Sequence, residues 1–217
     1  TLYTWFMNGT AVSAPAPVGA LHPAGWTFAG AAAFNGDRRA DLLWRRNADG
    51  MLYVWLMNAG TIIGQGSPAT VDRSWDVADL ADMDGDGRAD LVWRRAADGA
   101  VAVWFMNGAS STGGGTVGVL DPAIWSLYAA GDFDGDGKAD LLWRSTDGDT
   151  WVWLMDGTAF RSGASVGNPG PAWSIRSVGD FDGDGKADLA WRHADGPAYL
   201  WKMNGAAVSA SLPLANP

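Results

Sequence analysis

The stretch DFDGDGKADLLWR, residues 132–144, decides the architecture of the chain, because related stretches occur four times. Close copies are DMDGDGRADLVWR at residues 82–94 and DFDGDGKADLAWR at residues 180–192, and a weaker copy, AFNGDRRADLLWR, lies at residues 33–45. In each copy an acidic loop leads into a short apolar segment with a Trp. That Trp falls at positions 44, 93, 143 and 191, in steps of 49, 50 and 48 residues, which indicates a repeated structural unit.

The acidic loops have the composition of calcium sites. Each full copy places carboxylates at loop positions 1, 3, 5 and 9, a Gly at position 6 and a usable backbone carbonyl at position 7. A flexible set of oxygen donors suits calcium better than magnesium, and a chain with no Cys and two His offers little to zinc or copper. We therefore expect about three calcium sites. The predicted ligands are Asp82, Asp84, Asp86, Arg88 and Asp90 in the first full loop, Asp132, Asp134, Asp136, Lys138 and Asp140 in the second, and Asp180, Asp182, Asp184, Lys186 and Asp188 in the third, with the Arg and the two Lys acting through their carbonyls.

The weaker loop predicts a fourth, degenerate site. Ala33 replaces its leading Asp and Arg38 replaces its turn Gly, so only Asn35, Asp37 and Asp41 remain as ligands. None of the loops is an EF-hand, because position 12 of the three full loops is a Trp instead of the bidentate Glu. A strand-like segment follows each loop, so we expect the ion between two strands.

The net charge follows from the loops. The formal charge is −9, and the three full loops hold 12 of the 24 acidic residues, so three bound calcium ions would bring it to −3. The sequence has no basic stripe for phosphates and no apolar run of membrane-spanning length, which disfavours nucleic-acid partners and a membrane span. Because calcium is millimolar outside cells, we expect a secreted or extracellular protein, and the start without Met favours a mature or trimmed product.

Each repeat divides into four strand-like pieces. In the third unit they are WSLYAAGDF, ADLLWRS, DTWVWLMDG and TAFRSGASVG, and Asp-Gly or Asn-Gly dipeptides suitable for tight hairpins connect several of them. The third piece is apolar on both faces and must be covered on both sides. The sequence therefore predicts an all-β, β-propeller-type array of four-stranded antiparallel blades. The predicted parts are an N-terminal half-unit at 1–22 and full units at 23–72, 73–122, 123–170 and 171–217.

Together, GDFDGDGKADLLWR at residues 131–144 and VWLMDG at residues 152–157 resemble the FG-GAP or VCBS-type repeat. The pattern is similar to the calcium-bearing blades of integrin alpha-chain propellers and to those of secreted bacterial and fungal lectins. The resemblance implies a β-propeller with calcium between the first two strands of a blade. Such relatives often have seven blades, whereas this chain has four and a half units.

The repeated aromatic residues divide into two groups. The Trp after each loop stands at one register in every unit and is expected in the core between blades. Two residues before the third-strand Trp the residue varies, which favours partial exposure and stacking against a ligand. The predicted ligand-binding residues are Tyr3, Tyr53, Trp151 and Tyr199, with Ala102 in the remaining unit.

An Arg follows the loop Trp in every unit, at positions 45, 94, 144 and 192. Two interpretations are open: hydrogen bonds to a sugar, or ion pairs with loop Asp residues on a neighbouring strand, which we favour. Catalysis is disfavoured because the chain has no Cys nucleophile and the calcium loops account for most of its paired carboxylates, so we expect no enzyme.

The composite prediction is a secreted calcium-binding recognition module that binds carbohydrate or an extracellular protein, in the manner of a lectin or adhesin. The alternatives are a structural subunit built by strand pairing between chains, with a possible homo-oligomer, or a non-catalytic domain of a larger secreted hydrolase.

Overall fold

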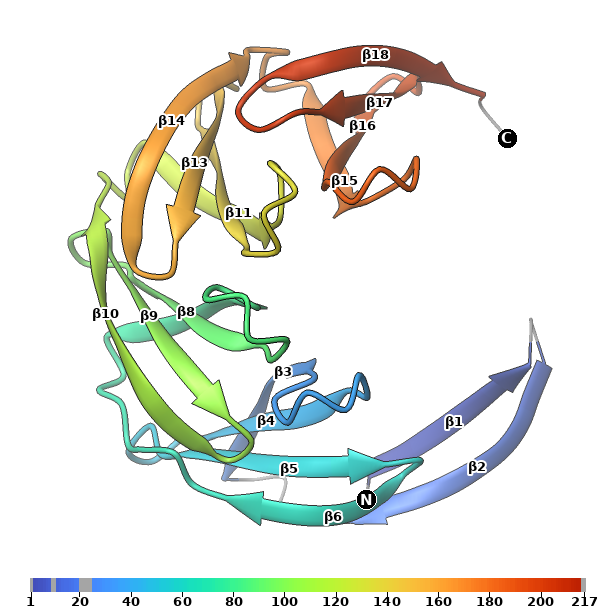
Figure 1. Ribbon diagram of the computed structural model, residues 1–217, viewed down its shortest axis with the longest axis vertical. Coiled ribbons are helices and arrows are strands. Elements are labelled where there is room, and N and C mark those ends of the chain that lie inside the picture. Colours follow the sequence, from blue (N-terminus) through green and yellow to red (C-terminus); the bar gives the residue numbers. More distant parts are fainter. Residues whose placement is uncertain (1, 9–10, 20–24, 216–217) are drawn as a thin grey trace.

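The computed structural model describes residues 2–8, 11–19 and 25–215, and these residues form strands and loops without a helix. The described strands form four four-stranded sheets and one two-stranded sheet, and these sheets follow a single open arc (Figure 1). The predicted all-β array of four blades with an additional half-blade is confirmed.

The strands follow one another within each sheet. The N-terminal hairpin contains β1 (Leu2–Asn8) and β2 (Ala11–Gly19). Blade 1 contains β3 (Trp26–Ala32), β4 (Asp41–Arg46), β5 (Leu52–Asn58) and β6 (Thr61–Gly66). Blade 2 contains β7 (Trp75–Ala81), β8 (Asp90–Arg95), β9 (Ala100–Asn107) and β10 (Ser110–Val119). Blade 3 contains β11 (Trp125–Gly131), β12 (Asp140–Ser145), β13 (Thr150–Asp156) and β14 (Ala159–Gly167). Blade 4 contains β15 (Trp173–Gly179), β16 (Asp188–His193), β17 (Ala198–Met203) and β18 (Val208–Leu214).

Every pairing within a blade is antiparallel between consecutive strands. In blade 3, for example, Leu142 of β12 is opposite Val152 of β13, and Trp143 is opposite Trp151. This register places the loop Trp and the variable aromatic position on the same face of the blade, because directly opposed residues in an antiparallel pair share a face.

The blades stack through apolar side chains on both faces. Between blades 2 and 3, Val92 and Val103 of blade 2 pack with Leu141 and Trp143 of blade 3, and all four side chains are fully buried. The equivalent Trp93 and Trp191 are exposed by only 1% and 2%. The loop Trp residues of blades 2 to 4 are therefore core residues, as predicted.

The repeated Arg binds the backbone leading into the next blade, so the predicted pairing with loop Asp residues is wrong for Arg94 and Arg144. Arg144 Nη2 donates to the carbonyls of Gly170 at 2.8 Å and Trp173 at 2.7 Å. Its guanidinium lies 4.8 Å from the ring centroid of Trp191, and Arg94 has the same relation to Trp143 in the next blade. The Arg lies at the rim opposite the acidic loop, because loop and Arg are at the two ends of the same strand.

The N-terminal hairpin packs on blade 1. Val18 of β2 joins a buried cluster with Trp55 and Met57 of β5. In the part of the chain that the structure describes, β1 pairs only with β2, so its other edge has no strand beside it. The hairpin therefore occupies the place of the two outer strands of a blade that lacks the two inner ones.

Candidate functional site

The acidic loops join the first and second strands of blades 2, 3 and 4, as the sequence predicts for the calcium loops. Glycines at loop positions 4 and 6 adopt left-handed backbone conformations, with φ of 81° and 85° at Gly135 and Gly137. In the degenerate first loop Arg38 takes the position of the second Gly and has φ of 62°. A non-Gly residue in this region costs free energy, so the first loop holds its shape less readily than the others.

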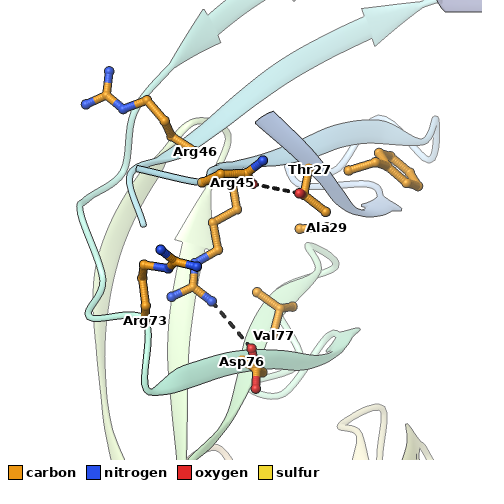
Figure 2. A pocket seen from close by; sticks show the side chains of 9 residues that line it. Thr27, Ala29, Arg45, Arg46, Arg73, Asp76 and Val77 are labelled. Atoms are coloured by element: carbon orange, nitrogen blue, oxygen red, sulfur yellow. Dashed lines mark hydrogen bonds and ion pairs between the residues drawn. The ribbon is translucent and has the colours of Figure 1, made fainter. Parts of the chain in front are cut away.

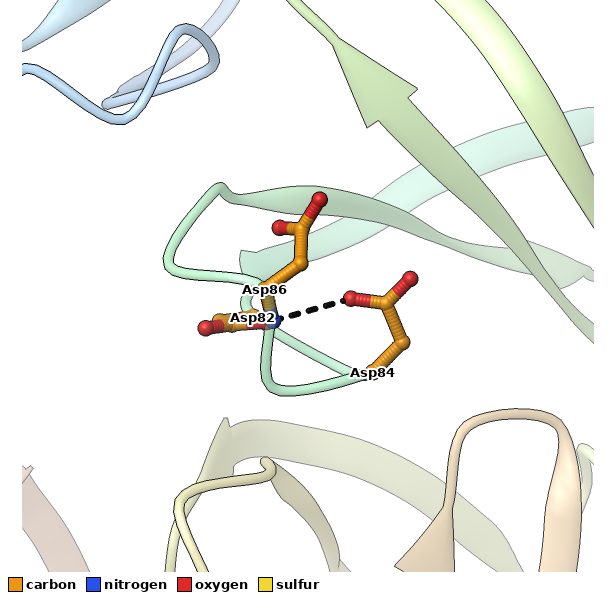
Figure 3. Close-up of side chains that lie close together, drawn as sticks. All are labelled: Asp82, Asp84 and Asp86. Atoms are coloured by element: carbon orange, nitrogen blue, oxygen red, sulfur yellow. Dashed lines mark hydrogen bonds between the residues drawn. The ribbon is translucent and has the colours of Figure 1, made fainter.

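The side chains at loop positions 1, 3 and 5 lie close together on one loop (Figure 3). Asp82 Oδ1 accepts a hydrogen bond from Gly85 N at 2.8 Å, its Oδ2 accepts one from Gly87 N at 2.7 Å, and Asp84 Oδ1 accepts one from Asp86 N at 3.1 Å. The loop thus curls around its own carboxylates. Each of Asp82, Asp84 and Asp86 offers an oxygen, and these oxygens lie within 4.8 Å of one another.

This spacing fits a calcium ion. Oxygens bound to one calcium at about 2.3–2.6 Å can be at most about 5 Å apart, on opposite sides of the ion. Asp132, Asp134 and Asp136 form the same group in blade 3. In blade 4 the group is Asp180, Asp182 and Asp188, at positions 1, 3 and 9, and Asp184 at position 5 is not part of it. No such group is found in the first loop among the described residues, where Asn35 instead hydrogen-bonds Asp37, at 3.2 Å through its Nδ2.

The carboxylate at loop position 9 has a structural task that the sequence did not indicate. Asp140 is fully buried, and its two oxygens accept hydrogen bonds from Phe133 N at 2.9 Å and Met155 N at 2.8 Å. It therefore ties the loop to the third strand of its own blade. Burial raises the pKa of Asp140 to about 7, and it does the same for Asp90.

The same arrangement, which we call the Asp staple, occurs in every blade. The four staple residues, all at most 1% exposed, are Asp41, Asp90, Asp140 and Asp188. In the degenerate loop Asp41 still accepts from Phe34 N at 2.9 Å and from Met57 N at 2.7 Å. Of the four, only Asp188 also joins a converging carboxylate group. The staple gives Asp41 a structural role in the first loop, where Ala33 replaces the leading Asp.

Basic side chains neutralise part of each acidic cluster. Arg88 Nη1 lies 2.6 Å from Asp86 Oδ2, Arg161 Nη1 lies 2.7 Å from Asp136 Oδ2, and Lys202 Nζ lies 2.8 Å from Asp182 Oδ2. Arg161 and Lys202 belong to outer strands, and no sequence motif marked them. The carbonyl ligands at Arg88, Lys138 and Lys186 stay a prediction.

The variable aromatic residues line small pockets at the interfaces between blades. Trp151 forms a pocket of about 210 Å³ with Leu120, Trp125, Trp143 and Trp153. Tyr199 forms a pocket of about 230 Å³ whose other lining residues are Pro169, Trp173, Trp191, Trp201 and Ser211. Both aromatic side chains are partly exposed. Tyr53 is also partly exposed and lies against Trp26, with ring centroids 5.8 Å apart, whereas the side chain of Tyr3 lies outside the described residues.

The Trp151 ring is held in place by its neighbours. Its Nε1 donates to Asp149 Oδ2 at 2.7 Å, and the other carboxylate oxygen accepts from Ser165 Oγ at 2.7 Å. Trp125 meets it edge to face at a centroid distance of 6.3 Å. The pocket is therefore a preorganised aromatic surface with a carboxylate beside it.

A larger and more polar pocket lies between blades 1 and 2 (Figure 2). It has a volume of about 360 Å³, and Thr27, Phe28, Asn47, Arg73 and Asp76 are among its lining residues. Arg45 crosses it to Asp76, with 3.7 Å between Nη1 and Oδ1. These residues come from three separate segments, and no motif connected them in the sequence.

The chain was compared with known proteins. A family model described as an FG-GAP-like repeat matches residues 33–93, 82–143 and 132–191. No curated protein matches the chain. In the described residues no helix is long and apolar enough to cross a membrane. With three overlapping matches that span residues 33–191, each running from one acidic loop to the next loop Trp, the chain belongs to the FG-GAP-like repeat family.

Proposed function

We propose that this protein is an extracellular, calcium-binding recognition module that binds carbohydrate at the aromatic pockets between its blades. The observation that carries the proposal is the pocket around Trp151, where four indole side chains surround one small cavity. The module recognises its ligand and performs no catalysis on it.

Calcium is assigned to the three converging carboxylate groups. The residues that would hold it are Asp82, Asp84 and Asp86 in blade 2, Asp132, Asp134 and Asp136 in blade 3, and Asp180, Asp182 and Asp188 in blade 4. A bound calcium ion supplies positive charge that relieves the repulsion among these carboxylates. The calcium assignment in turn favours an extracellular location, because weak loop sites of this kind are filled at millimolar calcium.

A sugar ring matches the Trp151 pocket in size and chemistry. The cavity of about 210 Å³ is smaller than the pockets of drug-sized ligands, which begin at about 300 Å³, so it suits a single ring. The face of an indole ring packs against the apolar C–H face of a sugar. Because these rings are already held in place, they lose little conformational entropy when the sugar binds. Asp149, which orients Trp151, is a ready acceptor for a sugar hydroxyl at the same place.

Isothermal titration with a panel of neutral monosaccharides, in the presence of calcium, tests the proposal. We expect at least one sugar to bind, and Trp151→Ala to weaken that binding by about tenfold. Ile63→Ala is the control, because Ile63 is 57% exposed on blade 1, away from the aromatic pockets. If no sugar on a glycan array binds, or if both variants bind equally, the aromatic pockets are not carbohydrate sites.

A second candidate is a structural subunit that joins further β-strands to its open end. The free edge of β1 favours it, since an exposed edge offers unpaired backbone groups to another strand. Sedimentation of the chain with calcium, with and without residues 1–22, tests whether this end mediates assembly.

A further inference from the structure

We propose that the polar pocket between blades 1 and 2 is a second ligand site, which binds a sugar acid and holds its carboxylate group on Arg73. The pocket has a volume of about 360 Å³, and its charged lining residues are Arg45, Arg46, Arg73 and Asp76. The lining therefore carries three positive charges and one negative charge. This inference goes beyond the carbohydrate proposal and does not depend on it, because none of these residues lines an aromatic pocket.

Arg45 fixes the backbone that carries Arg73. Its Nη2 donates to the carbonyls of Asp72 at 2.9 Å and Val71 at 3.2 Å, and its Nη1 donates to the carbonyl of Trp75. These acceptors lie on both sides of Arg73 in the sequence, at the end of the connection between β6 and β7. The backbone of Arg73 is thus held in place before a ligand arrives, which reduces the entropy lost on binding.

The described residues neutralise the positive charges of the pocket only in part. Arg46 is paired with Asp49, through Nε at 2.9 Å and Nη2 at 2.6 Å. Arg45 Nη1 lies 3.7 Å from Asp76 Oδ1, and the Asp76 side chain is 73% exposed, so water screens this ion pair. Arg73 makes no hydrogen bond or ion pair with the residues that the structure describes. Figure 2 shows its side chain in the same pocket as that of Arg45, where its guanidinium is available to a carboxylate.

The basic residue distinguishes this interface from the other two between full blades. The connections from one blade to the next are residues 67–74, 120–124 and 168–172, and only the first contains an Arg or Lys. Its acidic residue, Asp72, does not line the pocket, and its Oδ1 accepts a hydrogen bond from Ser74 N at 2.8 Å. Because the other two interfaces form without a basic residue here, Arg73 is not needed for the blades to stack and is free to serve binding.

The uncharged part of the lining favours a small hydroxylated ligand. Thr27 Oγ1 donates to Asn47 Oδ1 at 2.7 Å, which orients the Asn47 amide and leaves its Nδ2 without a partner among the described residues. This Nδ2 can donate to a hydroxyl oxygen, while a guanidinium binds a carboxylate through two parallel hydrogen bonds. The Phe28 ring lies against Trp44, on the opposite face of the strand from Thr27. The pocket therefore offers donors and little aromatic surface, which suits a sugar acid better than a peptide carboxylate with large apolar neighbours.

Isothermal titration of the full chain at fixed ionic strength tests the inference, with glucuronate and galacturonate as probes and with glucose and galactose as their neutral counterparts. We expect at least one acid to bind more tightly than its counterpart by about tenfold or more, since hydrogen bonds to charged groups are strong. Arg73→Ala should remove this difference, and Arg73→Lys should restore only part of it, because Lys keeps the charge without the paired hydrogen bonds. Neither change should alter the melting temperature, because Arg73 is exposed.

The matched control is Arg176→Ala, which removes the same charge from an exposed position on β15 of blade 4 and should leave binding unchanged. Trp151→Ala should also leave binding of the acid unchanged, so this site and the aromatic pockets can fail separately. The inference is overturned if neither acid binds more tightly than its neutral counterpart, or if Arg73→Ala and Arg176→Ala weaken binding equally. It is also overturned if acetate or the peptide Gly-Asp-Gly binds as tightly as the acids, because the pocket would then recognise a carboxylate without its sugar.

Discussion

Removing the Asp staple of blade 3 separates the structural role of an acidic residue from its proposed role in binding metal. In Asp140→Ala two backbone amides, Phe133 N and Met155 N, lose the buried carboxylate that accepts their hydrogen bonds. Each unsatisfied buried amide costs about 1–3 kcal/mol, so the variant should lose about 2–6 kcal/mol of unfolding free energy. The loss should persist in excess EDTA, because neither hydrogen bond involves an ion.

The comparison variant is Asp134→Ala in the same loop. The Asp134 side chain is 20% exposed and lies 3.6 Å from Arg161, a partly solvated ion pair worth at most about 1 kcal/mol. In EDTA this variant should therefore melt close to the wild type, and in calcium it should fall well below it. Urea denaturation of both variants, with calcium and with EDTA, gives the four values. If EDTA removes the effect of Asp140→Ala as well, that residue acts through the metal and the staple argument is wrong.

Three further outcomes are expected. EDTA should lower the melting temperature and calcium should restore it better than magnesium, since calcium at a hundredfold excess over Kd would stabilise the native state by about 2.7 kcal/mol per site. Asp37→Ala in the degenerate loop should change this response less than Asp134→Ala, and an unchanged melting temperature would exclude metal binding. Trp143→Ala should lower the free energy of unfolding by about 3–5 kcal/mol, because it replaces a fully buried large side chain with a small one. Trp151→Ala should weaken ligand binding and change the melting temperature little. Equal destabilisation by both substitutions would place Trp151 in the core. Arg144→Lys should destabilise the chain by about 1–3 kcal/mol in urea, because Lys cannot reproduce the paired hydrogen bonds to Gly170 and Trp173, and a wild-type midpoint would contradict this.

Much of the fold could be predicted because each strand and loop of the repeat occurs in several copies in the sequence. The strand after each loop was recognisable from Leu-Leu-Trp-Arg, and the burial of Trp143 followed from its constant register. Both features depend on local sequence and on period, which are visible without tertiary structure. The half-blade at the N-terminus followed from counting strands within the repeat.

The candidate site was harder to predict from the sequence, because its contacts join residues that are far apart in the chain. The sequence marked Asp140 as an oxygen donor but could not show which groups it faces, and two backbone amides proved to be its partners. The carbonyl partners of Arg144 belong to the connection into the next blade, at a distance along the chain that no motif encodes. The polar pocket at Arg73 likewise gathers residues from separate segments of blades 1 and 2.

All four blades have an Asp staple, including the blade with the degenerate loop. The staples affect how the array should respond to a loss of calcium. A blade held together by its own buried hydrogen bonds does not depend on the proposed calcium ion for its shape, so calcium withdrawal should loosen individual loops before any blade unfolds. Neighbouring blades are coupled mainly through their shared faces, as in other linear repeat arrays. As the calcium concentration falls, the acidic loops should become more mobile in one blade after another. The stiffness of the array would then change gradually with calcium concentration.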